Sequence, residues 1–249
     1  QLHPNPPQPP LQTTKPRKSQ NFTKQTSEEF KYLRFLYTNA DGLLSKFSEL
    51  KERILESSPS IISVVETALQ KDQEDDRYCP DEFLKIDGYQ MFRKDNPAEI
   101  KGGIITYVKN HILVSKSKPI DILASEFRES LWLELDISGD KVMFGTVYRK
   151  GKSMPANNKL LLETISKVTR SYKKIVLCGD FNYPEIDWPN MKVNAGPYSQ
   201  PSRFVNCLDT NFLTQQVVET TRARGSNKPS LLDLVITENE QTLKAPVVH

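Results

Sequence analysis

The sequence predicts an α/β fold of the α+β type: a four-layer α/β/β/α sandwich of two mostly antiparallel sheets flanked by helices. Short apolar runs separated by Gly and Asp fill the middle of the chain and indicate strands. Segments with apolar residues at helical spacing lie on either side of them. With 249 residues and 37% hydrophobic content, the chain can bury one large core. These observations favour one domain over two.

Residues 1–30 differ in composition from the rest of the chain. They hold six of the 17 prolines and almost no large apolar residues, so burial cannot offset the entropy lost on ordering. The formal net charge of +3 arises within residues 1–31, which leaves the remainder neutral. We expect a disordered, basic, Pro-rich tail over 1–30 and a folded domain over 32–249. A neutral domain argues against nucleic-acid binding by bulk charge, although a local basic groove would still serve.

Two classes of protein are disfavoured by the composition. No run of apolar residues reaches the length of a membrane-spanning helix, and the N-terminus lacks the apolar core of a signal peptide. The three cysteines are widely spaced and fit neither a disulfide framework nor a zinc site. We therefore expect an intracellular protein in a reducing compartment, without membrane attachment.

Each element of the expected fold follows from a local pattern. A strand at 33–37 ends in the turn-forming segment 38–42, a helix over 43–56 follows from its apolar spacing, and a buried strand at 60–65 ends on Glu66. The middle of the chain indicates a β-meander of strands at 83–86, 89–92, 103–109, 130–137 and 141–148. The remaining elements are helices at 156–171 and 201–210 and strands at 174–179, 213–218 and 233–237.

Polar side chains follow several of these strands. They are Asn39 with Asp41, Glu66, Tyr148 with Arg149, and Asp180 with Asn182. Asp180 and Asn182 are two apart around Phe181, so in an extended chain they point to one side and Phe181 points into the core. Asp233 stands within an apolar run, where an unpartnered carboxylate would cost several kcal/mol.

Each of these residues also has an ordinary structural explanation. Residues 39–42 and 179–182 can be simple turns, and Glu66 can start a helix. Tyr148 can be a core residue with a hydrated hydroxyl, and Arg149 a solvated side chain.

Together, however, the polar residues indicate phosphate chemistry. Oxygen ligands such as Glu66 and Asp41, in a chain with no His or Cys cluster, suit Mg²⁺, which keeps several waters and binds a phosphate oxygen. Asn39, Asn182 and Tyr148 are neutral groups that can hold a phosphoryl group and an attacking water in line. This set of residues indicates a phosphodiesterase.

The chain resembles the endonuclease/exonuclease/phosphatase superfamily and, within it, the apurinic-type endonuclease domain of LINE-like non-LTR retrotransposons. The resemblance covers about residues 32–240. It is carried by six stretches in order: Leu36-Tyr37-Thr38-Asn39-Ala40-Asp41-Gly42-Leu43, Ser60-Ile61-Ile62-Ser63-Val64-Val65-Glu66-Thr67, Gly102-Gly103-Ile104-Ile105-Thr106-Tyr107, Gly145-Thr146-Val147-Tyr148-Arg149, Leu177-Cys178-Gly179-Asp180-Phe181-Asn182 and Ser230-Leu231-Leu232-Asp233-Leu234-Val235-Ile236-Thr237. The last of these and the nearby Asp187-Trp188 favour the retrotransposon branch over the repair enzymes.

The resemblance implies a role for each matching residue. Glu66 would bind Mg²⁺, with Mn²⁺ as an alternative, and Asn39 and Asp41 would lie close to the metal. Asp180 would align or activate the water, Asn182 would orient the scissile phosphate, and Tyr148 would support the transition state. Asp233 would accept a hydrogen bond from a catalytic histidine.

That histidine lies in a Ser-Asp-His motif in the family, beyond the position of Asp233. In this chain Val247-Val248 precede His249, His3 lies in the expected tail, and His111 follows Asn110 in an expected hairpin turn. We therefore expect a C-terminally truncated domain that lacks its last strand and is a weak or inactive nuclease as given.

Three functions remain open. The resemblance implies an endonuclease that nicks double-stranded DNA, as a monomer in the nucleus, to prime a reverse transcriptase normally found in the same polyprotein. The alternatives are a truncated or host-adopted remnant that binds DNA or protein without catalysis, and a phospholipid or inositol phosphodiesterase or phosphatase of the same fold.

Overall fold

Two β-sheets form the centre of the computed structural model, which describes residues 34–70, 74–115, 127–218 and 230–238. All of these residues fall within one compact unit, residues 33–249. The first sheet contains, in spatial order, β1 (Phe35–Asn39), β2 (Ile61–Val65), β4 (Ile104–Lys109) and β3 (Tyr89–Lys94). The second contains β11 (Thr214–Gln215), β12 (Asp233–Thr237), β8 (Lys174–Asp180), β7 (Asp140–Tyr148), β6 (Ser130–Ile137) and β5 (Leu113–Ser115).

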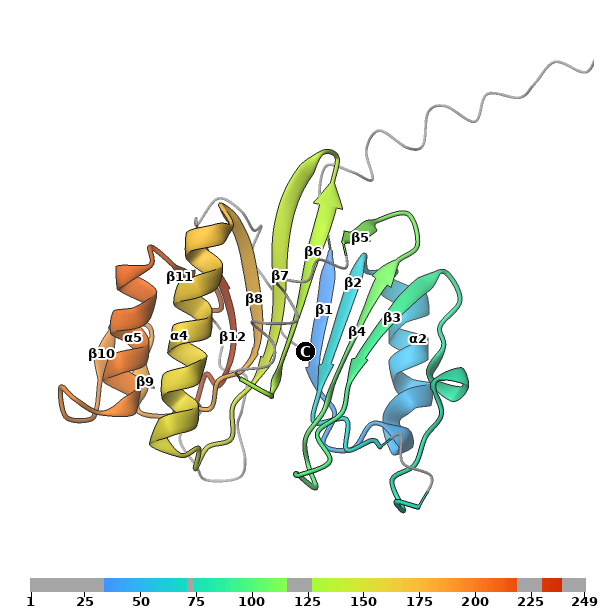
Figure 1. The fold of residues 1–249 in the computed structure, drawn as a ribbon, viewed down its shortest axis with the longest axis horizontal. Coiled ribbons are helices and arrows are strands. Elements are labelled where there is room, and N and C mark those ends of the chain that lie inside the picture. Colours follow the sequence, from blue (N-terminus) through green and yellow to red (C-terminus); the bar gives the residue numbers. More distant parts are fainter. Residues whose placement is uncertain (1–33, 71–73, 116–126, 219–229, 239–249) are drawn as a thin grey trace, which may run out of the picture. The chain divides into compact units, whose positions relative to one another are not determined.

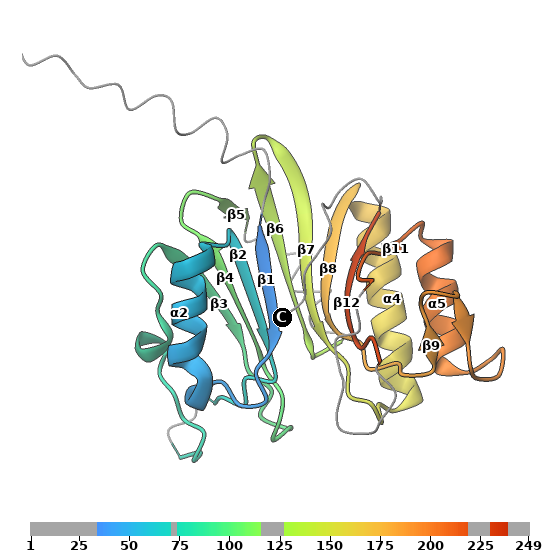
Figure 2. The ribbon, with the colours of Figure 1, turned by 180° about the vertical axis from the view of Figure 1, so that it is seen from behind.

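Helices cover the outer face of each sheet. Helix α2 (Phe47–Ser57), preceded by the 3-10 turn η1 (Leu44–Lys46), lies on the first sheet, and α4 (Pro155–Ser171) and α5 (Gln200–Thr210) lie on the second (Figures 1 and 2). A short hairpin of β9 (Ile186–Asp187) and β10 (Lys192–Val193) precedes α5. The predicted four-layer sandwich is confirmed. Each sheet is mixed, because β1 pairs with β2 and β7 with β8 in parallel, while the other pairings are antiparallel.

Helices α4 and α5 each combine an apolar stripe with a residue that favours a helix start. In α4, Pro155 occupies the first turn, where a missing N–H costs nothing, and Leu161, Ile165 and Val168 are buried against the second sheet. Helix α5 begins after Ser199, whose side chain accepts a hydrogen bond from the Ser202 N–H. No helix among the described residues is long and apolar enough to cross a membrane.

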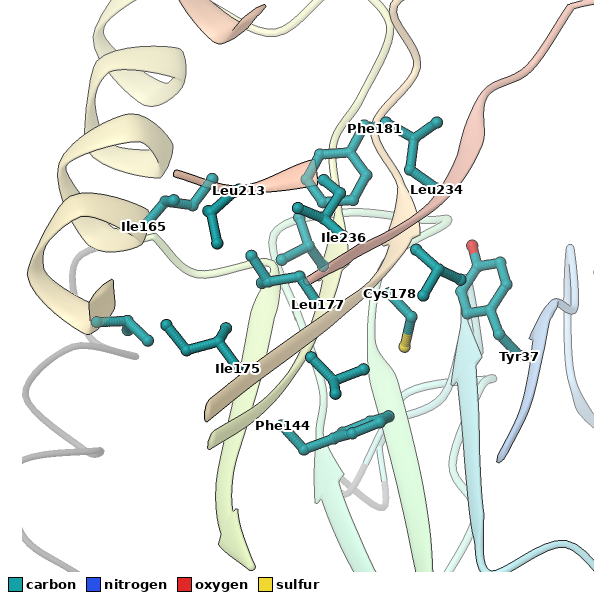
Figure 3. Close-up of a cluster of buried hydrophobic side chains, with 14 of the residues drawn as sticks. Tyr37, Phe144, Ile165, Ile175, Leu177, Cys178, Phe181, Leu213, Leu234 and Ile236 are labelled. Carbon is teal, nitrogen blue, oxygen red and sulfur yellow. The ribbon is translucent and has the colours of Figure 1, made fainter. Parts of the chain in front are cut away.

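The core continues on both faces of the second sheet. Leu177 and Ile236 face α4 beside Ile165, whereas Cys178, the next residue of β8, faces Tyr37 of the first sheet (Figure 3). Between the sheets the hydroxyls of Ser63, Thr106 and Thr146 form a buried cluster, with 2.8 Å between Ser63 Oγ and Thr146 Oγ1. Because each hydroxyl has a partner, this polar group can stay inside an apolar layer.

Three predictions about the elements were wrong or incomplete, and some strands were not predicted. Segment 83–86 is not a strand: Pro80, Asp81 and Glu82 start the 3-10 turn η2 (Asp81–Leu84), which buries Leu84. The predicted meander is split, since β3 and β4 belong to one sheet and β6 and β7 to the other. The predicted strand 213–218 is reduced to β11, and neither β5 nor the β9–β10 hairpin was predicted. Two predictions concern residues that the structure does not describe: the tail at 1–30 and the missing last strand at the C-terminal end.

Candidate active site

Polar residues from both sheets meet at one edge of the sandwich because of the strand directions. Strands β1 and β2 run parallel with Asn39 opposite Val65, so Asn39 and Glu66 leave the first sheet side by side. In the second sheet Tyr148 is opposite Asp180 in the parallel pair β7–β8, and Asp233 at the start of β12 is opposite Asp180 on its other side. The carboxyl ends of four strands and the start of a fifth therefore lie together.

Asn39 links the two sheets through its side chain. Its Nδ2 donates to Glu66 Oε1 at 2.7 Å and to Asp180 Oδ2 at 3.3 Å, while its Oδ1 accepts from the Asp41 N–H at 3.1 Å. Asp180 is 3% exposed. One neutral amide thus holds two carboxylates, from opposite sheets, on either side of it.

Asp41 lies further out, at the rim. Its carboxylate, 47% exposed, is 2.5 Å from Lys101 Nζ. The backbone is left-handed at both Asp41 (φ 45°) and Glu66 (φ 52°), and the Gly42 N–H donates to the Glu66 carbonyl at 2.9 Å. The loops after β1 and β2 are therefore fastened to each other at the site.

Two tyrosines face the carboxylates. Burial raises the pKa of Tyr148, and the negative charge and hydrogen bonding of Glu66 raise it further. Tyr37, fully buried in β1, donates to Asp233 Oδ1 at 2.9 Å. Burial, followed by the charges of Asp233 and Asp180, raises the pKa of Tyr37 well above its ordinary value. Both phenols are therefore neutral donors. Tyr37 could not be predicted as a site residue, because in the sequence it resembles any other aromatic strand residue.

The strand β8 reaches the site only because of Gly179. A Cβ at this position would lie 1.8 Å from the Val147 carbonyl oxygen of β7. Phe181 points into the core as predicted and packs on Phe204, with ring centroids 5.2 Å apart. The extended geometry expected for residues 180–182 does not extend through Asn182, which is left-handed (φ 52°). A turn therefore sets the direction of the Asn182 side chain, and strand alternation does not.

Arg149 is not solvated. Its side chain is buried, and the residue is 4% exposed. Nη1 donates to the carbonyls of Phe181 (3.1 Å) and Asn182 (2.8 Å), and Nε donates to Asn158 Oδ1 (2.8 Å). The guanidinium also lies 3.7 Å from the centroid of the Tyr183 ring. Asn158, on α4, was not predicted from the sequence, since an Asn inside a helix gives no functional signal.

The site contains no histidine among the described residues. His111 is exposed on the turn that follows the last residue of β4. The site lies at the other end of this strand, where Ile104 pairs with Val65, the residue before Glu66. His3 and His249 lie outside the described residues. The structure thus brings together Asn39, Glu66, Tyr148, Asp180 and Asp233, places Asn182 on the adjoining turn and puts Asp41 at the rim.

The donor atoms of this site fit a divalent metal of the Mg²⁺ type. Glu66 and Asp180 offer carboxylate oxygens, and Mg²⁺ is commonly held by one or two carboxylates with waters and substrate phosphate completing its shell. The described residues contain no cluster of three or more His, Cys, Asp or Glu side chains that could hold an ion. The described residues therefore do not surround a metal ion with protein ligands alone, and water and substrate would complete its coordination.

Comparisons with known proteins found a matching family model and several structures with a similar fold. Residues 142–248 match the family model described as endonuclease-reverse transcriptase. The endonuclease domain of TRAS1, a telomere-specific non-LTR retrotransposon, superposes with a TM-score of 0.61 at 14% identity, covering 82% of this chain and 84% of that one. An AP endonuclease from Leishmania major gives 0.64 at 16% identity, with 84% and 79% covered. No curated protein sequence matches the chain.

A third similar structure is a 3′ phosphatase from Neisseria bound to a product DNA hairpin, with a TM-score of 0.59, 15% identity and coverage of 83% and 86%. These similarities show that the chain shares the fold of the TRAS1 endonuclease domain, the Leishmania AP endonuclease and the Neisseria 3′ phosphatase.

Proposed function

We propose that this chain is a magnesium-dependent endonuclease domain that nicks double-stranded DNA to provide a 3′ hydroxyl for reverse transcription. The observation that carries the proposal is the Asn39 amide between Glu66 and Asp180. It brings a metal-binding carboxylate and a water-binding carboxylate to the two sides of one small site. The DNA-acting relatives described above support the choice of substrate.

Each side chain then has a distinct role. Glu66 holds the metal, which when bound acts as a Lewis acid on a phosphate oxygen. Asp180 accepts a proton from the attacking water, and Asn39 fixes both carboxylates through its two donor bonds. Tyr148 and Asn182 donate hydrogen bonds to the non-bridging phosphate oxygens, where negative charge develops. Tyr37 holds the Asp233 carboxylate in place.

The bond changes balance without a further reactant. The water oxygen bonds to phosphorus, the bond from phosphorus to the 3′ oxygen breaks, and the departing 3′ oxygen takes a proton from solvent. The products are a 5′ phosphate and a 3′ hydroxyl that a polymerase can extend. We further propose that the domain works in the nucleus as a monomer, next to a reverse transcriptase domain of the same polyprotein.

Plasmid nicking with defined substrate arms tests the proposal. Supercoiled plasmid is incubated with the protein and Mg²⁺, and the 3′ ends are then extended with a labelled nucleotide by a polymerase. Slow formation of open-circular product with extendable ends is the expected result, because the sequence predicts a weak nuclease. Release of phosphate or headgroup from phosphoinositide vesicles, with no nicking, would instead support a lipid phosphodiesterase of this fold.

A second candidate is a protein that binds DNA without cutting it. It is favoured by the position of His111, the one histidine among the described residues, on a turn away from the site. Salt-sensitive DNA binding that is equal with and without Mg²⁺, in the absence of any nicking, would support this alternative.

A further inference from the structure

We propose that Arg149 is a positioning residue that sets the orientation of Asn182, and that Asn158 of helix α4 holds Arg149 for this task. The inference rests on the proposed function, because Asn182 matters as a phosphate-binding group. It goes beyond that function by assigning a role to a buried cation that the chemistry does not use.

The contacts of Arg149 point at the Asn182 turn. A buried guanidinium has to be compensated, and its hydrogen bonds here go to two main-chain carbonyls and one side-chain amide. The two carbonyls belong to Phe181 and Asn182, the residues on either side of the peptide bond that leads into the turn. The Arg149 N–H also donates to the Asp180 carbonyl at 2.8 Å. Arg149 thus contacts three consecutive residues of the catalytic segment.

This arrangement explains how Asn182 keeps an unusual backbone. A left-handed conformation at a residue other than Gly is uncommon and persists when the surroundings hold it. The Arg149 side chain binds the Asn182 carbonyl on one side, and the Phe181 N–H donates to the Leu232 carbonyl (2.9 Å) on another. The turn is therefore fixed at its carbonyl end and at its entry, which leaves few directions for the Asn182 side chain.

Gly151 supplies a second, independent constraint from the same loop. A Cβ at Gly151 would lie 3.2 Å from Asn182 Oδ1 and 3.3 Å from Nδ2. The loop after β7 therefore lies directly against the Asn182 amide group, and Arg149 holds the main chain of the same residue. Together they form a clamp on Asn182, made by residues 149 and 151.

Asn158 connects this clamp to helix α4. Its Oδ1 accepts from Arg149 Nε, its Nδ2 donates to the Ser153 carbonyl at 3.1 Å, and the residue is buried. Tyr183 covers the guanidinium face. The planar guanidinium is therefore held at its edge and its face, a geometry that Lys cannot reproduce.

A double-mutant cycle on nicking rates separates positioning from general destabilisation. In the wild-type background Arg149→Lys is expected to lower kcat about 10- to 100-fold with little change in KM, since a 1 Å misplacement of a catalytic group costs about that much. In an Asn182→Ala background the same change should lower kcat less than about 3-fold, because its target is gone. Equal losses in both backgrounds would overturn the proposal.

Two further variants guard against simple unfolding. Asn158→Ala keeps Arg149 but removes the acceptor for its Nε. It should lower kcat less than Arg149→Lys does, and again mainly when Asn182 is present. Lys150→Met, a change at the half-exposed neighbour of Arg149, is the matched control and should leave kcat within about 2-fold.

If the wild type does not nick DNA, the proposed function is refuted, but the positioning role of Arg149 can still be tested by a structural measurement. The NMR signals of the Asn182 side-chain amide and its φ-dependent backbone coupling are compared between variants. Arg149→Lys and Asn158→Ala should shift both, and Lys150→Met should not. Unchanged Asn182 signals in a folded Arg149→Lys protein would refute the positioning role whatever the activity.

Discussion

Replacing Asn39 by Asp places a third carboxyl between Glu66 and Asp180, whose oxygens lie 2.7 and 3.3 Å from Asn39 Nδ2. Two unit charges about 4 Å apart interact by roughly 4 kcal/mol at the effective dielectric near a protein surface. The introduced carboxyl would avoid this cost by keeping its proton, so its pKa would be raised in the folded state. Partial exposure of the site moderates the effect, and we expect a loss of about 2–3 kcal/mol at pH 8.

The sign of the pH dependence follows from the raised pKa. A carboxyl whose pKa is higher in the folded than in the unfolded protein destabilises the fold increasingly as pH rises above its unfolded value of about 4. Asn39→Asp should therefore cost about 1.5 kcal/mol at pH 5, and the cost should rise to its full value of about 2–3 kcal/mol by pH 8. Asn39→Ala is the matched control. It loses both donors but adds no charge, so its cost should vary much less with pH.

Urea unfolding of the three proteins without added metal, at pH 5, 6.5 and 8, measures these differences. Mg²⁺ should also reduce the difference in unfolding free energy between Asn39→Asp and wild type at pH 8, since a cation offsets the extra charge. A pH-independent cost for Asn39→Asp, equal to that of Asn39→Ala, would refute the claim that the two carboxylates are brought together by this amide.

Two other substitutions test the framework of the site. Gly179→Ala should destabilise the fold by about 3 kcal/mol or more in urea unfolding, because its Cβ would overlap the Val147 carbonyl, whereas Gly196→Ala, with open space around it, should change stability by less than about 0.5 kcal/mol. Similar costs for the two would contradict the close approach of β7 and β8. Tyr37→Phe should cost about 1–3 kcal/mol at pH 7 through the lost bond to Asp233. Since the pKa of Tyr37 is raised on folding, its stabilisation is complete below pH 10 and falls above it. The difference between wild type and Tyr37→Phe should therefore shrink from pH 10 to pH 11, and a constant difference would exclude this linkage.

The sequence was most informative where one local rule decides the outcome. Leu161, Ile165 and Val168 repeat at helical spacing, and the α4 helix lies within one residue of its predicted start. Residues 175–178 are apolar and are followed by Gly-Asp, so both the strand and the polar residue at its end could be predicted from the sequence. Acids and amides that follow strands were a good guide to the site, because parallel neighbours bring such ends to the same edge.

Other features depend on partners distant in sequence, which local patterns do not contain. Tyr37 and Asp233 are 196 residues apart, and only the packing of two sheets makes them a pair. Arg149 resembled a surface residue because no local sequence pattern indicates its hydrogen bonds to Asn158 and to the Asn182 carbonyl. The split of the meander between sheets has the same origin, since turn and strand signals do not say which sheet a hairpin joins.

The central claim is that Asp180 and Glu66, held by Asn39, form a metal-dependent centre that cuts DNA. The most direct measurement is the single-turnover rate of plasmid nicking by wild type, Asp180→Asn and Glu66→Gln across a Mg²⁺ titration. We expect nicking that requires Mg²⁺, a loss of about 10²- to 10⁴-fold in the rate of Asp180→Asn at saturating Mg²⁺, and a higher Mg²⁺ requirement in Glu66→Gln. Wild-type nicking that both variants retain in full, or that proceeds without a divalent metal, would contradict it.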